Sequence, residues 1–160
     1  MSQNKTLIVF ETKRGITEKS ANKIADVLRS QFHLEVDVVN LAEQDTPDLA
    51  PYRNMVVGGG VRMGKVYRKA TDFLGNDLTG KQVAFFICSA WGGTPGTSEY
   101  HDQAKKWFAE KALKKYPNVK PVSVEVFGGF IRYFNRTMIN NIDLAKVEAW
   151  ATELGKIFAQ

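Results

Sequence analysis

A buried strand that runs through a short polar turn into an amphipathic helix constrains this sequence more than any other feature. The strand is the apolar run Leu7–Phe10, whose length and β-branched content are typical of a fully buried strand. After the turn, apolar residues recur on one helical face, at Ala21, Ile24, Ala25 and Leu28. The first N–H groups of such a helix lack intrahelical partners and the helix dipole favours an anion, so this unit has the outline of a phosphate site.

The turn between strand and helix has the composition of a phosphate-binding loop. Its residues are Thr12, Lys13, Arg14, Gly15, Ile16 and Thr17. The threonine hydroxyls can donate hydrogen bonds, and Gly15 permits a positive φ or a close backbone approach. The turn has neither G-x-x-x-x-G-K-[ST] nor G-x-G-x-x-G, which argues against a triphosphate P-loop and a dinucleotide fingerprint. Two interpretations stay open: a site for one terminal phosphate of a mononucleotide, or an ordinary turn in which Thr17 caps the helix.

The remaining chain alternates strand and helix patterns. Strands are expected at 34–39, 54–58, 81–88 and 122–127, and helices at 17–32, 66–74, 97–115 and from about 143, the last with Leu144, Val147, Ala151, Leu154 and Phe158 facing inward. The run 81–88 is apolar without alternation, as in a parallel sheet covered on both faces, whereas 34–39 alternates like an edge strand. The pattern predicts one α/β domain over residues 1–160, with a doubly wound, five-stranded parallel sheet in three layers.

Two glycine-rich loops are expected at the carboxyl ends of the third and fourth strands, where open α/β sheets bind ligands. Their candidate ligand-binding residues are Gly59, Gly60, Val61, Arg62, Met63 and Gly64 in one loop, and Ser89, Ala90, Trp91, Gly92 and Gly93 in the other. Glycines let backbone amides approach a flat polar ring. Trp91 is interpreted either as a ring that stacks on the ligand or as a packed core residue.

These loops together resemble those of the flavodoxin family. T-x-x-G-x-T at Thr12–Thr17 is similar to the family's FMN phosphate loop, and the segments Gly60–Lys65 and Ser89–Thr94 are similar to its ring-binding loops. The resemblance covers essentially the whole chain and implies a flavodoxin-like fold with FMN as cofactor. Typical flavodoxins have no cation beside the phosphate, whereas Lys13 and Arg14 lie within the loop here.

One flavodoxin-like branch, the bacterial quinone-dependent protoporphyrinogen dehydrogenases, shares two further patterns. These are V-V-G-G-G-V-R-M-G-K at 56–65 and G-G-F-I-R-Y-F-N-R-T-M-I-N at 128–140, although this chain is too short to hold all of that branch's insertion. The resemblance implies an FMN oxidoreductase that uses a quinone or an acidic small molecule. A soluble electron carrier with a redox partner protein is the close alternative. A non-redox signalling module is disfavoured, because receiver domains need clustered aspartates and Glu11 is the only acid near the first turn.

Charge and composition limit the partners. The net charge of +5 suggests an acidic partner, but no nucleic-acid-binding motif is found, so no nucleic acid is expected. His33 and His101 lack ligand-like neighbours, so no metal is expected, and Cys88 at the end of a buried strand is interpreted as a core residue.

A single cysteine and the lack of a signal peptide predict a cytoplasmic protein. The aromatic and basic residues of 130–139 are interpreted either as a link that packs under the last helix or as a surface that meets a flat anionic substrate, a quinone or the inner membrane face.

Overall fold

The expected strand and helix alternation is present, with bounds that differ mainly at the glycine-rich segments. The computed structural model describes residues 5–12, 15–62, 65–89, 102–128, 130–133, 136–140 and 143–160, with only the backbone at residue 62 and in β7 and β8. The strands are β1 (Lys5–Glu11), β2 (Val36–Asn40), β3 (Tyr52–Arg62), β4 (Lys65–Val66), β5 (Gln82–Cys88), β6 (Ser123–Phe127), β7 (Phe130–Tyr133) and β8 (Arg136–Asn140). The helical elements are α1 (Ile16–Phe32), α2 (Arg68–Phe73), η1 (Lys105–Glu110), α4 (Lys111–Leu113) and α5 (Leu144–Phe158).

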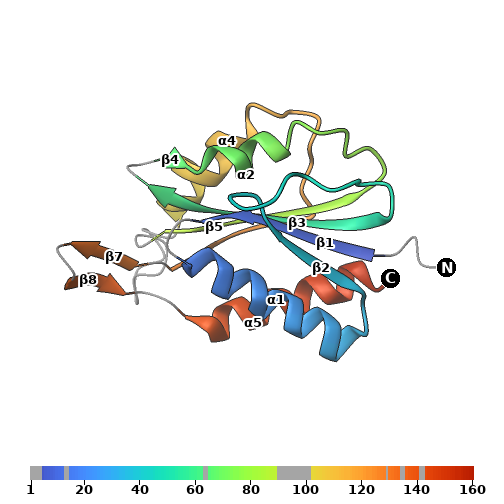
Figure 1. Cartoon of the computed structure of the whole chain (residues 1–160), viewed down its shortest axis with the longest axis horizontal. Coiled ribbons are helices and arrows are strands. Elements are labelled where there is room, and N and C mark those ends of the chain that lie inside the picture. The colour runs from blue at the N-terminus through green and yellow to red at the C-terminus, as the bar shows by residue number, and fades with distance from the viewer. Residues whose placement is uncertain are drawn as a thin grey trace.

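The main sheet runs β2-β1-β3-β5-β6, and all neighbours on this path are parallel (Figure 1). The chain therefore moves outward from β1 to β2 and then crosses back to β3 on the other side, which makes β1 and β3 the point where strand order reverses. β2 lies at one end of this path, as its alternating pattern predicted. The doubly wound α/β fold expected from the sequence is confirmed.

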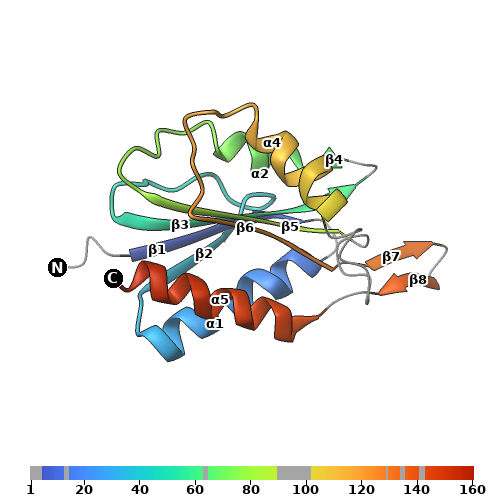
Figure 2. The ribbon, with the colours of Figure 1, turned by 180° about the vertical axis from the view of Figure 1, so that it is seen from behind.

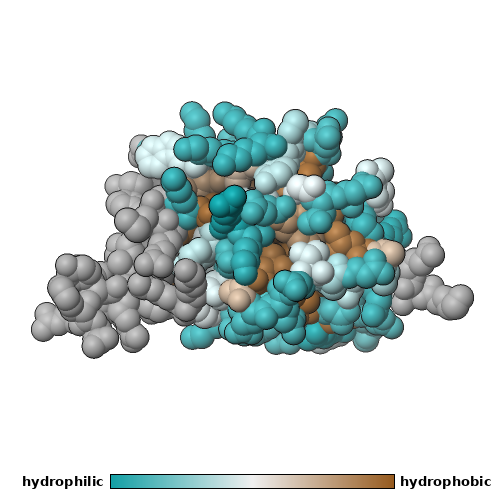
Figure 3. All heavy atoms as spheres, turned by 45° about the horizontal axis from the view of Figure 1, so that its top comes forward, coloured by the Kyte–Doolittle hydropathy of each residue, from teal (hydrophilic) through white to brown (hydrophobic). Residues whose placement is uncertain are grey.

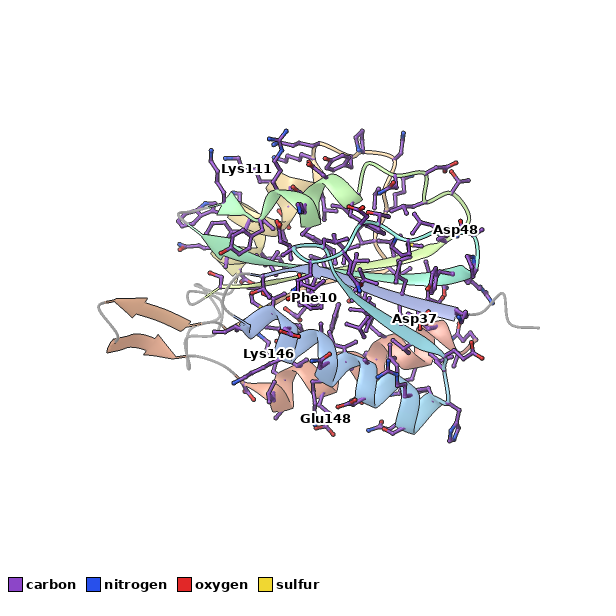
Figure 4. The ribbon with its side chains drawn as sticks, viewed as in Figure 1. Phe10, Asp37, Asp48, Lys111, Lys146 and Glu148 are labelled. Atoms are coloured by element: carbon purple, nitrogen blue, oxygen red, sulfur yellow. The ribbon has the colours of Figure 1, made fainter. Side chains whose placement is uncertain are left out.

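Helices cover both faces of the sheet, as Figures 1 and 2 show from opposite sides. On one face, Ile8 and Phe10 of β1 pack with α1 and α5, and Figure 4 shows Phe10 between the sheet and this helical layer. On the other face, Leu7 and Val9 pack with α2 and the segment 104–113. Consecutive residues of β1 thus enter different cores, which explains why its sequence is apolar without alternation.

The glycine-rich loop predicted after residue 58 was wrong in its first part. β3 continues through Gly58, Gly59 and Gly60, which pair with β1 and β5. A Cβ on Gly58 would lie 2.2 Å from the ring of Phe86, and one on Gly59 would lie 2.7 Å from Val66. The glycines are therefore strand residues that make room for neighbouring side chains, rather than residues of a flexible loop.

The segment after β6 was predicted to be an irregular link, but it contains the antiparallel hairpin β7–β8, in which Ile131 pairs with Ile139. Figures 1 and 2 show this hairpin projecting from the sheet at the side of the strands' carboxyl ends. The helix predicted over 97–115 is described from residue 102 to 113 and includes the π-helical turns of η1; residues 97–101 lie outside the described part. Strand pairing across the hairpin depends on backbone contacts that a one-strand pattern does not reveal.

Three helix details also differ from expectation. α1 begins at Ile16 with Gly15 as its N-cap, so the prediction that Thr17 is the cap was wrong. α2 is two residues later at its start than the predicted 66–74 helix. In α5, Leu144 is 39% exposed rather than inward-facing, while Trp150, absent from the predicted core, is buried and donates from Nε1 to Ser123 Oγ at 2.8 Å. The predicted Val147, Ala151, Leu154 and Phe158 are buried.

Candidate functional site at the carboxyl edge of the sheet

Three strand ends meet beside the amino end of α1. Glu11 at the end of β1 pairs with Gly59 of β3, and Gly60 pairs with Cys88 of β5. These contacts place the end of the first strand, the glycine run and the start of the 89–93 loop at one edge of the sheet. Sequence spacing predicted this convergence, and the strand register confirms it for the described residues.

The turn into α1 has the backbone form that an anion site needs. Gly15 has φ 81° and ψ −2°, a left-handed conformation that costs a non-glycine residue about 1–2 kcal/mol. A Cβ built on Gly15 would have no heavy atom within 4 Å, so an added side chain would meet no steric conflict and only the backbone conformation disfavours one. Helix geometry leaves the N–H groups of Ile16, Thr17 and Glu18 without intrahelical partners. Thr12 is buried at the other side of the turn.

Thr17 lies deeper than the sequence suggested. Its side chain is 1% exposed, and a Cβ on Gly60 would lie 3.2 Å from Thr17 Oγ1. Cys88 hydrogen-bonds with Ser20 at 3.7 Å and with Thr17. Burial raises the pKa of the Cys88 thiol to about 11, so the thiol stays protonated at neutral pH, as a core residue does. Thr17 thus joins α1 to the ends of β3 and β5.

Tyr67 and Glu11 complete the described edge and were not predicted as site residues. The Tyr67 N–H donates to the Gly60 carbonyl at 3.0 Å, and a Cβ on Gly60 would be 3.2 Å from the Tyr67 ring. The Glu11 carboxylate, which is 7% exposed, accepts the Lys69 backbone N–H at 3.0 Å. The only local signal for Tyr67 was an aromatic residue shortly after the glycine-rich segment 58–64, and nothing local predicted the partner of Glu11.

The cations near the edge are arranged unequally. Lys65 is exposed, whereas Arg68 lies 3.4 Å from Asp72 in an exposed pair. Lys69 turns its ammonium group to the Leu41 carbonyl at 3.2 Å. Of these three, only Lys65 has no ion pair or side-chain hydrogen bond among the described residues, so the field at the edge is weaker than a count of basic residues suggests.

The domain model described as "Flavodoxin domain" matches residues 7–152 of this chain. This chain belongs to the flavodoxin-domain family. It is 25% identical over 148 residues to protoporphyrinogen IX dehydrogenase [quinone] of Escherichia coli K12, covering 86% of this chain and 78% of that protein. Oxidised flavodoxin 1 of Bacillus cereus superposes with a TM-score of 0.62 at 19% identity, over 95% of this chain and 97% of its own. Flavodoxin 2 of that species gives 0.62 at 21%, over 97% of each chain.

Flavodoxin domains bind FMN, so membership confirms the cofactor expected from the sequence. The described residues of this flavodoxin domain fit a phosphorylated ligand. The left-handed Gly15 and the first-turn N–H groups, which lack intrahelical partners, give the backbone arrangement with which helix starts bind anions. Gly60 lacks the side chain that would press against Thr17 and Tyr67, so its backbone can lie close to both residues.

Part of the predicted site lies outside the described residues: Lys13, Arg14, Met63, Gly64, Ala90, Trp91, Gly92 and Gly93. Ser89 is described and buried, and its N–H donates to the Phe127 carbonyl at 2.9 Å. Val61 is half-buried beside β4.

A hollow of about 640 Å³ lies at the opposite edge of the sheet, between residues 74–81 and 115–120, away from this site. Among the described residues, no group of three or more His, Cys, Asp or Glu side chains could hold a metal ion.

Proposed function

We propose that this chain is an FMN-dependent oxidoreductase of the quinone-linked protoporphyrinogen IX dehydrogenase type. The observation that supports it most is the convergence of β1, β3 and β5 on the left-handed turn before α1, in a flavodoxin domain similar to a protein with that name. When bound, FMN supplies the redox chemistry, and the protein supplies position, field and access. The whole chain, residues 1–160, would act as one such domain.

In this proposal, the turn holds the FMN phosphate. Backbone N–H groups from Gly15 to Thr17 would donate to it, with the Thr12 hydroxyl and the cations Lys13 and Arg14 beside them. Because Thr17 is buried against Gly60 and Cys88, its hydroxyl serves mainly to fix the turn.

The carboxyl end of β3 and the two residues after it, together with the loop after β5, would enclose the flavin ring. The first set is Gly59, Gly60, Val61, Arg62, Met63 and Gly64, and the second is Ser89, Ala90, Trp91, Gly92 and Gly93. Trp91 would stack on the ring, and Tyr67 would support the floor behind Gly60, because its ring adjoins the Cα of that residue. Reduced flavin tends to carry negative charge, so a cation such as Lys65 near the ring would raise its midpoint potential.

A soluble carrier that exchanges electrons with a partner protein is the second candidate, supported by the likeness to two flavodoxins over nearly their whole length. The test is to load the full chain with FMN and supply protoporphyrinogen IX with a menaquinone analogue, then, separately, a flavodoxin reductase with its nicotinamide donor. The proposal predicts porphyrin formation coupled to quinol formation. Fast reduction by the reductase without porphyrin turnover would favour the carrier. No flavin uptake from added FMN would exclude both.

If the electron acceptor is a membrane quinone, the protein would work in the cytoplasm at the membrane face. No helix in the described part of the chain is long and apolar enough to cross a bilayer. The hairpin β7–β8 lies beside the carboxyl edge and is one place for contact with the membrane face. The reason is composition, because the segment 130–139 is rich in aromatic and basic residues.

A further inference from the structure

The helical segment 102–120 carries most of the chain's net charge. It contains six lysines and two acidic residues, while the net charge of the whole chain is +5. Four of the lysines are exposed on η1, α4 and the turn that follows: Lys106, Lys111, Lys114 and Lys115. None of these four forms an ion pair within the part of the chain that the structure describes. Exposed, unpaired cations leave this face attractive to an anionic surface.

Trp107 lies among these lysines with 57% of its surface exposed, the largest value among the exposed large apolar residues described. Burying an aromatic ring of this size is favourable, so an isolated exposed Trp beside lysines is typical of an interfacial helix. The molecule's other described Trp, Trp150, is buried. We call the set formed by Trp107 with the four lysines the basic Trp surface.

The π-helical turns of η1 explain why Trp107 faces outward. Ala104 and Ala109 are both fully or almost fully buried and are five residues apart, the spacing of a π turn. In a regular α-helix, positions three and four after Ala104 would share its buried face, which would direct Trp107 towards the sheet. The wider turn instead brings Ala109 inward and leaves Trp107 outside. Such π insertions occur frequently at functional sites.

The basic Trp surface lies on the same side of the sheet as α2, and η1 packs beside β4 near the carboxyl edge. Figure 4 labels Lys111 on this outer side, on the opposite side of the molecule from Glu148 on α5. Figure 3, in which this side comes forward, shows hydrophilic side chains across it. A partner bound here would therefore lie next to the candidate flavin edge, but would not cover it.

We infer that the basic Trp surface binds the surface of an anionic lipid bilayer, with Trp107 inserted at the headgroup level and the lysines over acidic headgroups. Lysines near an anionic bilayer each strengthen binding about fivefold, and Trp favours the membrane interface. An acidic protein would use the lysines equally well, but a single protruding Trp that lies among lysines suits a fluid interface better than a shaped protein pocket. The inference deepens the proposed quinone-linked function, and its test requires no flavin chemistry.

The test is flotation of the full FMN-loaded chain with vesicles of phosphatidylglycerol and phosphatidylcholine, compared with phosphatidylcholine alone. We expect binding to the anionic vesicles only, and release in about 0.5 M salt because charges are then screened beyond a few ångströms. Trp107→Ala should weaken binding about tenfold or more, and Lys111→Gln about fivefold. Trp107→Phe should retain most of the binding while losing the blue shift of Trp fluorescence on vesicle addition.

Lys156→Gln is the matched control, because Lys156 is an exposed lysine on α5, on the opposite layer. It should bind vesicles like the unmodified chain, and circular dichroism should show every variant folded. Equal binding to neutral vesicles, unchanged binding of Trp107→Ala, or an equal loss in Lys156→Gln would overturn the inference. The inference would also be wrong if the unmodified chain does not bind anionic vesicles. If, in addition, Lys111→Gln exchanges electrons more slowly with an acidic redox protein, the surface binds a protein instead. Porphyrin turnover with a soluble quinone would survive that result, which separates this inference from the proposed function.

Discussion

The Glu11 carboxylate accepts the backbone N–H of Lys69 at 3.0 Å, which ties the end of β1 to the first turn of α2. The carboxylate is buried, and Lys69 extends its own side chain to the Leu41 carbonyl. One hydrogen bond thus holds together the strand that leads into the phosphate turn and the helix behind Gly59. We expect this contact to matter both for stability and for the shape of the flavin edge.

Glu11→Ala should lower the free energy of unfolding by about 1.5–3 kcal/mol, because it removes a charge-assisted hydrogen bond and leaves the Lys69 N–H without this acceptor. Glu11→Gln keeps an acceptor oxygen and should lose less than half of that. Urea unfolding measures both variants. If Glu11→Gln is as unstable as Glu11→Ala, an acceptor oxygen at this position contributes nothing and this interpretation of the contact is wrong.

Gly15→Ala tests the left-handed turn and has a matched control. Gly15 and Gly80 have φ of 81° and 78°, and a Cβ at either position would meet no heavy atom within 4 Å. Each alanine substitution should therefore cost about 1–2 kcal/mol of stability through backbone strain. Only Gly15 lies at the proposed phosphate site, so FMN titration should show weaker binding in Gly15→Ala and unchanged affinity in Gly80→Ala. If Gly15→Ala and Gly80→Ala bind FMN with equal affinity, the phosphate does not bind at this turn.

Gly58→Ala should be strongly destabilising, because the new Cβ would lie 2.2 Å from the Phe86 ring. Overpacking of this kind costs about 1–3 kcal/mol. A second substitution, Phe86→Leu, makes room for the methyl group but removes aromatic packing with Phe127 and Trp150. In a double-mutant cycle the two changes should therefore cost less together than the sum of the single changes. Additive costs would show that the two residues do not compete for space.

Alkaline stability should depend on Tyr52. Its hydroxyl donates to Asp37 Oδ2 at 2.6 Å, and burial, followed by this bond, raises the pKa of Tyr52 to about 12 from 10.0. The folded protein therefore holds this proton more tightly than the unfolded chain. The protonated Tyr52 thus contributes fully to the free energy of unfolding below pH 10, and this contribution is lost as the pH rises towards 12. Unfolding measured from pH 7 to 12 should show that loss, and Tyr52→Phe should flatten it while costing about 1 kcal/mol at pH 7.

At the acid end, the hydrogen bond from Tyr52 lowers the pKa of Asp37 below 3.8. The ionised Asp37 therefore contributes to the free energy of unfolding above pH 3.8, and this contribution disappears as the pH falls further. Because the Asp37 side chain is about half exposed, the loss should be small. Tyr52→Phe should reduce it, and an unchanged acid limb in that variant would contradict the link between the two residues.

Cys88 provides a probe of folding. Burial raises the pKa of its thiol to about 11, and the side chain is covered by Ser20 and Thr17. A thiol reagent at pH 8 should therefore react with the native protein only through opening of the structure, and at once in denaturant. Rapid native labelling would show that the end of β5 opens readily.

The fold was predictable where apolar runs report burial on both faces, as in Leu7–Phe10 and 83–88. Glycine was the main source of error, because the three-glycine run looks like a loop but forms strand where Phe86, Val66 and Tyr67 fill the space beside it. The hairpin at 130–140 and the π turn at Lys105–Glu110 depend on pairing and packing that no local pattern encodes. Within the site, strand order brought the ends of β1, β3 and β5 to one edge, while the partners of Glu11 and Thr17 required the folded structure.

The close contact between α1 and α5 also has a consequence for synthesis of the chain. A Cβ on Gly155 would lie 2.1 Å from the Phe32 ring, so the two helices pack directly against each other. Since α5 follows every strand in the chain, a ribosome releases all the strands before it releases the helix that shields Phe86 and Phe127. Nascent chains stalled before residue 144 should therefore expose an apolar surface to chaperones until translation resumes.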